Sequence, residues 1–133
     1  SKDLGLLNRV RFAGFVPDYE MPYLYRQSIA LVMPTYFGPT NLPPLEAFRL
    51  GVPVLYSDLP GLRDQVGKAA LLMNLQDPRS MADHLACLMK DGNLRQSLID
   101  KGTHRLDGLS ESNPEKTLTI VLKKFQHCRD CWI

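Results

Sequence analysis

Residues 29–56, IALVMPTYFGPTNLPPLEAFRLGVPVLY, decide the fold that the sequence predicts. The first five are continuously apolar and end before a proline, which is typical of a strand buried on both faces. Pro43 and Pro44 then favour a helix start, because proline is preset for the first helical turn, and Gly51 favours the helix end. A second apolar run over 52–56 predicts another short strand. The stretch therefore predicts strand, loop, helix and strand in succession.

Short apolar runs and helical patterns also alternate along the rest of the chain. The further elements that we expect are a strand over 10–16, a helix over 18–28 with Asp18 as N-cap, a helical turn over 63–66, a strand over 69–73, a helix from Asp77 to Met89, a helix over 93–101 that stops at Gly102, and a helix from Asn113. Strands that alternate with helices predict an α/β fold with a Rossmann-like parallel sheet and helices on both faces. No repeat or linker interrupts residues 1–133, so we expect a single domain.

Composition limits the classes of function. The chain has 133 residues, 44% of them hydrophobic, with a formal net charge of +2. It has no basic stripe of the kind that nucleic-acid binding needs, and no apolar run reaches the roughly 18 residues of a membrane span. Three cysteines do not make a disulfide framework, so we expect a cytoplasmic protein. Basic residues near the C-terminus beside Trp132 leave peripheral association with a membrane open.

The cysteine and histidine pattern does not predict a metal site. Cys128 and Cys131 have the two-residue spacing of a zinc or redox pair, and His127 lies beside them. A closed zinc site needs four ligands, and no matching second pair is present. The remaining candidates fall on predicted helices: His84, Cys87 and His104. We therefore expect neither a metal nor a cofactor, and reduced, partly buried thiols.

The entrance of the helix after Pro43 is the place where a ligand is expected. In open α/β sheets, ligands bind outside the carboxyl ends of the strands, and the loop over 34–43 leaves one such end. Backbone N–H groups and the helix dipole favour an anion there. Glu46, expected in the first helical turn, has two interpretations: it stabilises the helix end, or it accepts hydrogen bonds from sugar hydroxyls. A ligand with both a ribose and a diphosphate, such as a nucleotide sugar, suits this site.

At this point a set of motifs resembles a known family. The chain is similar to the C-terminal, donor-binding domain of the retaining glycosyltransferases with two Rossmann-like domains (the GT-B fold), glycosyl transferases group 1, which includes glycogen and sucrose synthases. The motifs that carry the resemblance are, in family order, Val10-Arg-Phe-Ala-Gly-Phe-Val16, the Tyr25 helix, Met33-Pro-Thr-Tyr36, Pro43-Pro-Leu-Glu-Ala47, Gly51-Val-Pro-Val54, Ser57-Asp58, Gly61-Leu62, Val66-Gly-Lys-Ala-Ala70 and Asp77-Pro78.

The resemblance implies roles for residues around the loop. In the family two glutamates with seven residues between them frame the donor: the first contacts the transferred sugar and the second the nucleotide ribose. Glu46 matches the second glutamate, whereas Gly38 stands in place of the first, on the sugar side of the loop. The backbone of Thr40, Asn41 and Leu42 falls on the stretch that binds diphosphate and sugar. Either a side chain at 40 or 41 replaces the missing acid, or the Gly-Pro-Thr-Asn sequence marks a distinct subfamily, which we favour.

The resemblance also implies what lies around the donor. The nucleotide base is held near Phe15, Val16 and Pro17, for which plain strand-end roles stay open. The chain is expected to be a partial domain that lacks the first strands of the donor domain and the N-terminal acceptor domain. Its implied partners are a nucleotide-diphosphate sugar, a glycan or lipid-linked acceptor, and the N-terminal domain of the same protein. Without that domain the chain is expected to be inactive.

The resemblance thus implies the donor-binding portion of a retaining glycosyltransferase of the cell-surface polysaccharide type, working without a metal. Two alternatives remain. Nucleotide-sugar epimerases share the two-domain architecture, although the motif order resembles them less. A non-catalytic nucleotide-binding or scaffold module would account for the missing glutamate at Gly38.

Overall fold

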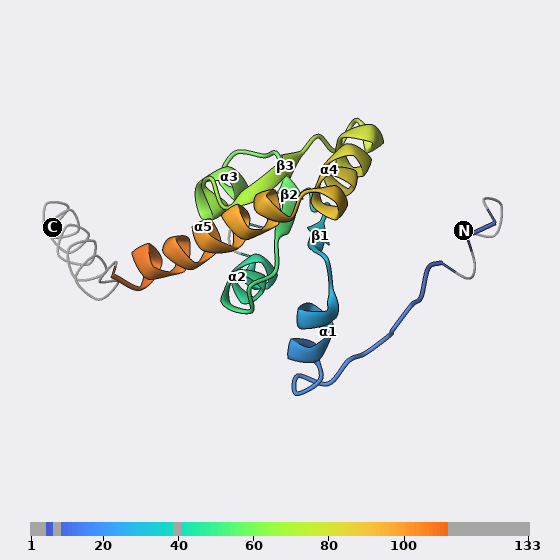
Figure 1. Cartoon of the computed structure of the whole chain (residues 1–133), viewed down its shortest axis with the longest axis horizontal. Coiled ribbons are helices and arrows are strands. Elements are labelled where there is room, and N and C mark those ends of the chain that lie inside the picture. The colour runs from blue at the N-terminus through green and yellow to red at the C-terminus, as the bar shows by residue number, and fades with distance from the viewer. Residues whose placement is uncertain (1–4, 7–8, 39–40, 112–133) are drawn as a thin grey trace, which may run out of the picture.

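Three short strands form a parallel sheet at the centre of the computed structural model, which describes residues 5–6, 9–38 and 41–111 (Figure 1). They are β1 (Leu31–Met33), β2 (Val54–Ser57) and β3 (Ala70–Met73), in the order β1-β2-β3. Each strand therefore pairs with the strand that follows it in the chain. The predicted α/β fold with a parallel sheet is confirmed.

Five helices connect and cover these strands in the described part of the chain. They are α1 (Met21–Gln27), α2 (Leu42–Arg49), α3 (Leu62–Val66), α4 (Pro78–Lys90) and α5 (Gly92–Glu111). The start of α4 is as predicted: Pro78 is the first helical residue, and the carboxylate of Asp77 accepts a hydrogen bond of 3.0 Å from the N–H of Arg79. Such a cap satisfies one of the N–H groups that have no partner within the helix.

The sheet is covered on both faces because its side chains alternate. Val54 and Tyr56 of β2 pack with Tyr25 of α1, with α2 and with α3, whereas Leu55 packs with Leu88 of α4 and with α5. All four residues of β2 are buried, and those of β1 are half-buried. The prediction of helices on both faces is thus confirmed, with the central strand buried on both sides and β1 less buried than expected.

The predicted strand over 10–16 is wrong. This segment forms no strand, and the side chains of Phe12 and Phe15 are 88% and 91% exposed. Figure 1 shows the blue chain before α1 running away from the sheet. An alternating pattern becomes a strand only beside a hydrogen-bonding neighbour, and the described residues offer none there. Asp18 also fails to cap α1, whose N-cap is Glu20, without a side-chain hydrogen bond.

The predicted helix end at Gly102 is also wrong, because α5 continues through this residue to Glu111. Gly102 is buried where α5 crosses α2, and a Cβ atom there would lie 2.8 Å from Cδ1 of Phe48. The glycine therefore allows close packing of two helices and does not end one of them. The expected helix from Asn113 and the pair Cys128 and Cys131 lie outside the described residues.

Membrane crossing can be assessed for the described helices. None of them combines the length and the apolar character that a membrane span requires.

Candidate functional site

The loop after β1 enters α2 in a way that leaves few backbone donors. Asn41 is the N-cap of α2, and the next three residues are Leu42, Pro43 and Pro44. The first N–H groups of a helix have no partner within it, and proline has no N–H. Asn41 and Leu42 therefore supply the backbone N–H groups that the start of this helix can offer to an anion. Thr40 lies outside the described residues.

The side chains of Tyr56 and Gln65 fix the position of Asn41. Its Nδ2 donates a hydrogen bond to the hydroxyl of Tyr56, which donates to Oε1 of Gln65 over 3.1 Å. Nε2 of Gln65 in turn donates to the backbone oxygen of Asn41 over 2.6 Å. We call these residues of α2, β2 and α3 the polar triangle. Sequence reasoning missed Tyr56 and Gln65, because no local pattern signals a bond between residues this far apart.

Gly38 is required by the position of Asn41. Its φ of 134° lies in a region that side chains rarely adopt, and a Cβ atom there would clash with Oδ1 of Asn41 and lie 2.8 Å from its Nδ2. The site where the resemblance implies a first glutamate thus has room for glycine alone while Asn41 keeps its place.

Helix α5 stabilises the polar triangle through hydrogen bonds to α3, the helix that carries Gln65. Nε of Arg105 donates a hydrogen bond of 2.9 Å to the backbone oxygen of Gln65, and its Nη2 donates to the backbone oxygen of Asp64. These bonds satisfy carbonyl groups of α3, so the short helix that carries Gln65 is held against α5.

Glu46 lies in the second turn of α2, not in the first turn as expected, because the helix already begins at Leu42. The helix dipole acts mainly within the first turn, so Glu46 gains little from it. Its side chain is exposed, and Oε2 accepts a hydrogen bond of 3.1 Å from the hydroxyl of Tyr25. Tyr25 is 7% exposed and belongs to the core beneath α1 and α2. A buried phenol therefore holds an exposed carboxylate.

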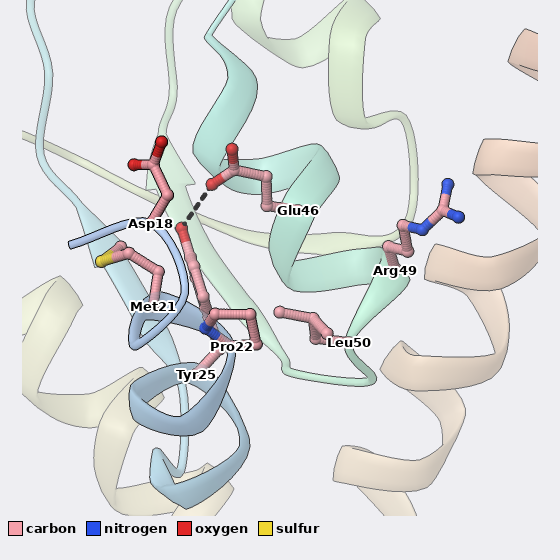
Figure 2. Close-up of a pocket in the computed structure, with 7 residues that line it drawn as sticks. All are labelled: Asp18, Met21, Pro22, Tyr25, Glu46, Arg49 and Leu50. Carbon is pink, nitrogen blue, oxygen red and sulfur yellow. Dashed lines mark hydrogen bonds between the residues drawn. The ribbon is translucent and has the colours of Figure 1, made fainter.

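A pocket of about 420 Å³ surrounds this pair (Figure 2). It is lined by Asp18, Met21, Pro22, Tyr25, Glu46, Arg49 and Leu50. Figure 2 shows the carboxylates of Asp18 and Glu46 at the same end of the pocket, whereas the guanidinium of Arg49 points away from them. Because Asp18 directly follows Pro17, the pocket lies beside the segment in which the base-binding residues are expected. Within that segment Phe15 is exposed and Val16 and Pro17 are half-buried.

The sequence of residues 1–105 matches the model of one protein family, Glycosyl transferases group 1. The chain belongs to this family. The resemblance to glycosyl transferases group 1 described above is thereby confirmed, and the Rossmann-like sheet agrees with it.

Known group 1 relatives agree with this assignment. The chain is 32% identical over 104 residues to O-antigen chain mannosyltransferase B of Escherichia coli, covering 78% of this chain and 27% of the relative. It is 33% identical over 127 residues to D-inositol 3-phosphate glycosyltransferase of Frankia alni, covering 94% of this chain and 30% of the relative. The chain thus spans about 30% of the length of these enzymes.

A solved structure supports the fold of this group 1 chain. Sucrose-phosphate synthase from Thermosynechococcus elongatus superposes with a TM-score of 0.74 at 27% identity. The superposition covers 98% of this chain and 32% of the synthase. The parallel sheet with helices on both faces is therefore an arrangement that this chain shares with the synthase.

Other residues considered from the sequence lie away from this pocket of the group 1 domain. His104 and His84 both lie on helices, as expected; His104 is exposed, whereas His84 is half-buried and its Nε2 lies 3.0 Å from the backbone oxygen of Leu72. Cys87 is free and exposed, so the expected partial burial of this thiol is wrong. It follows Leu85 and precedes Leu88 on α4, whose apolar face packs on the sheet. Among the described residues no group of histidines, cysteines and carboxylates could hold a metal.

The bond between Tyr25 and Glu46 predicts a loss of stability in alkali. Burial above all, then the hydrogen bond to Glu46 and its charge, raise the pKa of Tyr25 to about 12 from the ordinary 10.0. As the pH rises, the unfolded chain releases this proton first. The stability that protonated Tyr25 contributes is therefore complete below pH 10.0 and is lost as the pH approaches 12.

The variant Tyr25→Phe lacks the phenol, so the proton release of residue 25 no longer contributes to the pH dependence of stability. We expect urea unfolding at about pH 8 and about pH 11 to show a smaller loss of stability in the variant than in the wild type. An equal loss in both proteins would contradict the raised pKa.

Proposed function

We propose that this chain is the donor-binding part of a retaining glycosyltransferase, which transfers a sugar from a nucleotide-diphosphate sugar to a glycan or lipid-linked acceptor. The observation that carries the proposal is the position of Glu46. It matches the family's second glutamate in the sequence motif, exposes its carboxylate into a pocket between α1 and α2, and is held there by Tyr25. A carboxylate in this setting suits a pair of ribose hydroxyls.

The remaining roles follow from the same ligand. The N–H groups of Asn41 and Leu42, with the backbone of Thr40, bind the diphosphate and the sugar, and Gly38 lies on the sugar side of the loop. Phe15, Val16 and Pro17 lie near the base, next to the pocket that Asp18 shares with Glu46. The side chain of Asn41 is occupied in the polar triangle. This supports a distinct loop subclass over replacement of the missing acid by Asn41.

Residues 1–133 are proposed to be a single, partial C-terminal Rossmann-like domain. An N-terminal domain of the intact protein supplies the facing wall of the cleft and the acceptor site. The share of about 30% that the chain covers in its relatives supports this division. The O-antigen named for one relative supports a cell-surface glycan as acceptor. Catalysis requires both walls, because transfer depends on positioning and on stabilising the departing diphosphate.

A non-catalytic nucleotide-binding module is a second candidate, favoured by one observation. Gly38 lacks the carboxylate that contacts the transferred sugar in the family, and its φ leaves room for glycine alone. Such a module would bind the nucleotide without turning over its sugar. Incubation of the intact protein with a nucleotide sugar and acceptor glycans distinguishes the two functions by release of the nucleoside diphosphate.

The first test of the proposal is calorimetric titration of the intact protein with UDP, GDP and ADP, repeated with Glu46→Gln. One nucleotide is expected to bind, and the variant is expected to bind it about tenfold more weakly, because a charged acceptor is lost. Asp83→Asn removes one charge from the exposed face of α4 and is the matched control, with unchanged binding expected. A folded protein that binds none of the three nucleotides would overturn the proposed function.

A further inference from the structure

We propose that Tyr25 is a positioning residue of the donor site, which holds the carboxylate of Glu46 in the orientation that accepts two neighbouring ribose hydroxyls. The inference deepens the proposed function and rests on the role given there to Glu46. Helix α1 thereby takes part in recognising the nucleotide, in addition to α2 and the loop that precedes it.

In the hydrogen bond between Tyr25 and Glu46, the donating hydroxyl has a fixed position, whereas the accepting carboxylate can move. The ring of Tyr25 is packed in the core with Ala47 and Phe48 of α2, so its hydroxyl has a defined position. Glu46 is exposed on the surface of α2, where a free glutamate side chain would sample several rotamers. The hydrogen bond of 3.1 Å between them selects one of these. Restricting a binding group before the ligand arrives lowers the entropy lost on binding.

The hydrogen bond from Tyr25 also leaves acceptor positions on both oxygens of the Glu46 carboxylate available to a ligand. Tyr25 donates to Oε2 alone, and among the described residues no protein group donates to Oε1. Each carboxylate oxygen can accept two hydrogen bonds, so Oε1 and the second position on Oε2 can receive two adjacent hydroxyls. The phenol of Tyr25 is protonated at neutral pH, as its hydrogen bond to the carboxylate requires, so it acts there as a donor.

No other described side chain performs this task. Arg49 is one helical turn after Glu46 and could pair with it, but its guanidinium points away from the carboxylate in Figure 2. Asp18 shares the pocket and carries the same charge, so it cannot donate a hydrogen bond to Glu46 when ionised. The orientation of Glu46 therefore depends on Tyr25.

The test compares Tyr25→Phe with Tyr23→Phe in the intact protein. Phenylalanine at 25 keeps the buried ring and removes the donor, whereas Tyr23 lies on the same helix with its side chain 63% exposed. Calorimetry uses the nucleoside diphosphate that binds the wild type, among UDP, GDP and ADP, and its 2′,3′-dideoxy form. We expect Tyr25→Phe to weaken the ribonucleotide about fivefold and to leave the dideoxy form unchanged, and Tyr23→Phe to change neither.

A second variant gives an independent reading. Glu46→Asp shortens the side chain by one methylene, so it keeps the charge but no longer reaches the hydroxyl of Tyr25. The same selective loss for the ribonucleotide is expected, and adding Tyr25→Phe to Glu46→Asp should weaken binding no further. Binding of the ribonucleotide by Glu46→Asp at wild-type strength would overturn the proposal, even if Tyr25→Phe did not fold.

The remaining outcomes separate this inference from the proposed function. Equal weakening of the ribonucleotide and the dideoxy form by Tyr25→Phe would show a structural role for the tyrosine and overturn the inference. So would wild-type binding by Tyr25→Phe while Glu46→Gln binds weakly, which would leave the proposed function intact. Unchanged binding by Glu46→Gln itself would remove the basis of both.

Discussion

Replacing Gly102 by valine is expected to lower the free energy of unfolding by about 3 kcal/mol, because the new side chain overpacks the contact between α5 and α2. A Cβ atom at 102 would lie 2.8 Å from Cδ1 and 3.1 Å from Cγ of Phe48, whose ring is buried between the two helices. The branched γ carbons of valine add further contacts at the same place. Urea unfolding followed by circular dichroism measures the change.

Gly108 is the matched control on the same helix. A Cβ atom there meets nothing within 4 Å, so Gly108→Ala is expected to stabilise the chain by about 0.5 to 1 kcal/mol through helix propensity. Opposite signs for the two variants would locate the effect in packing. Wild-type stability of Gly102→Val would mean that α5 does not lie against Phe48 in solution.

Restoring the family's first glutamate with Gly38→Glu is expected to destabilise the chain by about 2 to 3 kcal/mol and to weaken nucleotide binding. The φ of 134° strains any residue with a side chain, and its Cβ would collide with the amide of Asn41. Displacing Asn41 would break the polar triangle and shift the N–H groups at the start of α2. Urea unfolding and calorimetry with the bound nucleotide measure both effects.

The double variant Gly38→Glu with Asn41→Gly separates the two causes. It removes the collision and keeps the strained φ, so we expect only part of the lost stability to return. If Gly38→Glu alone were as stable as the wild type and bound the nucleotide more tightly, the loop would have room for the acid and the required pairing of Gly38 with Asn41 would be wrong.

The sequence predicted those features whose cause is local. The apolar runs of β2 and β3, the two prolines near the start of α2, and the Asp77-Pro78 start of α4 each need only neighbouring residues, and each element is present within two residues of its expected bounds. Glu46 was identified as the residue of interest, although the prolines placed the start of its helix too late. The family resemblance also depended on such short motifs, and it was confirmed over residues 1–105.

The features that were missed depend on contacts between distant residues. The hydroxyl of Tyr25 donates a hydrogen bond to the carboxylate of Glu46, 21 positions away, and Gln65 donates one to Asn41 over 24 positions. No local sequence pattern predicts either bond. The local pattern predicts a helix end at Gly102, because the Phe48 ring that requires a glycine there belongs to α2, far away in the sequence. The alternation over 10–16 predicted a strand, but pairing depends on a neighbour that local sequence does not specify.

The polar triangle described above also has an electrostatic consequence. The polar triangle of Asn41, Tyr56 and Gln65 contains no ion pair, so its hydrogen bonds are expected to be insensitive to ionic strength. The entrance of α2 therefore keeps its shape in dilute buffer and in concentrated salt alike. Any response of ligand binding to salt is then expected to arise from the charges of the ligand and of the pocket, not from loss of these three hydrogen bonds.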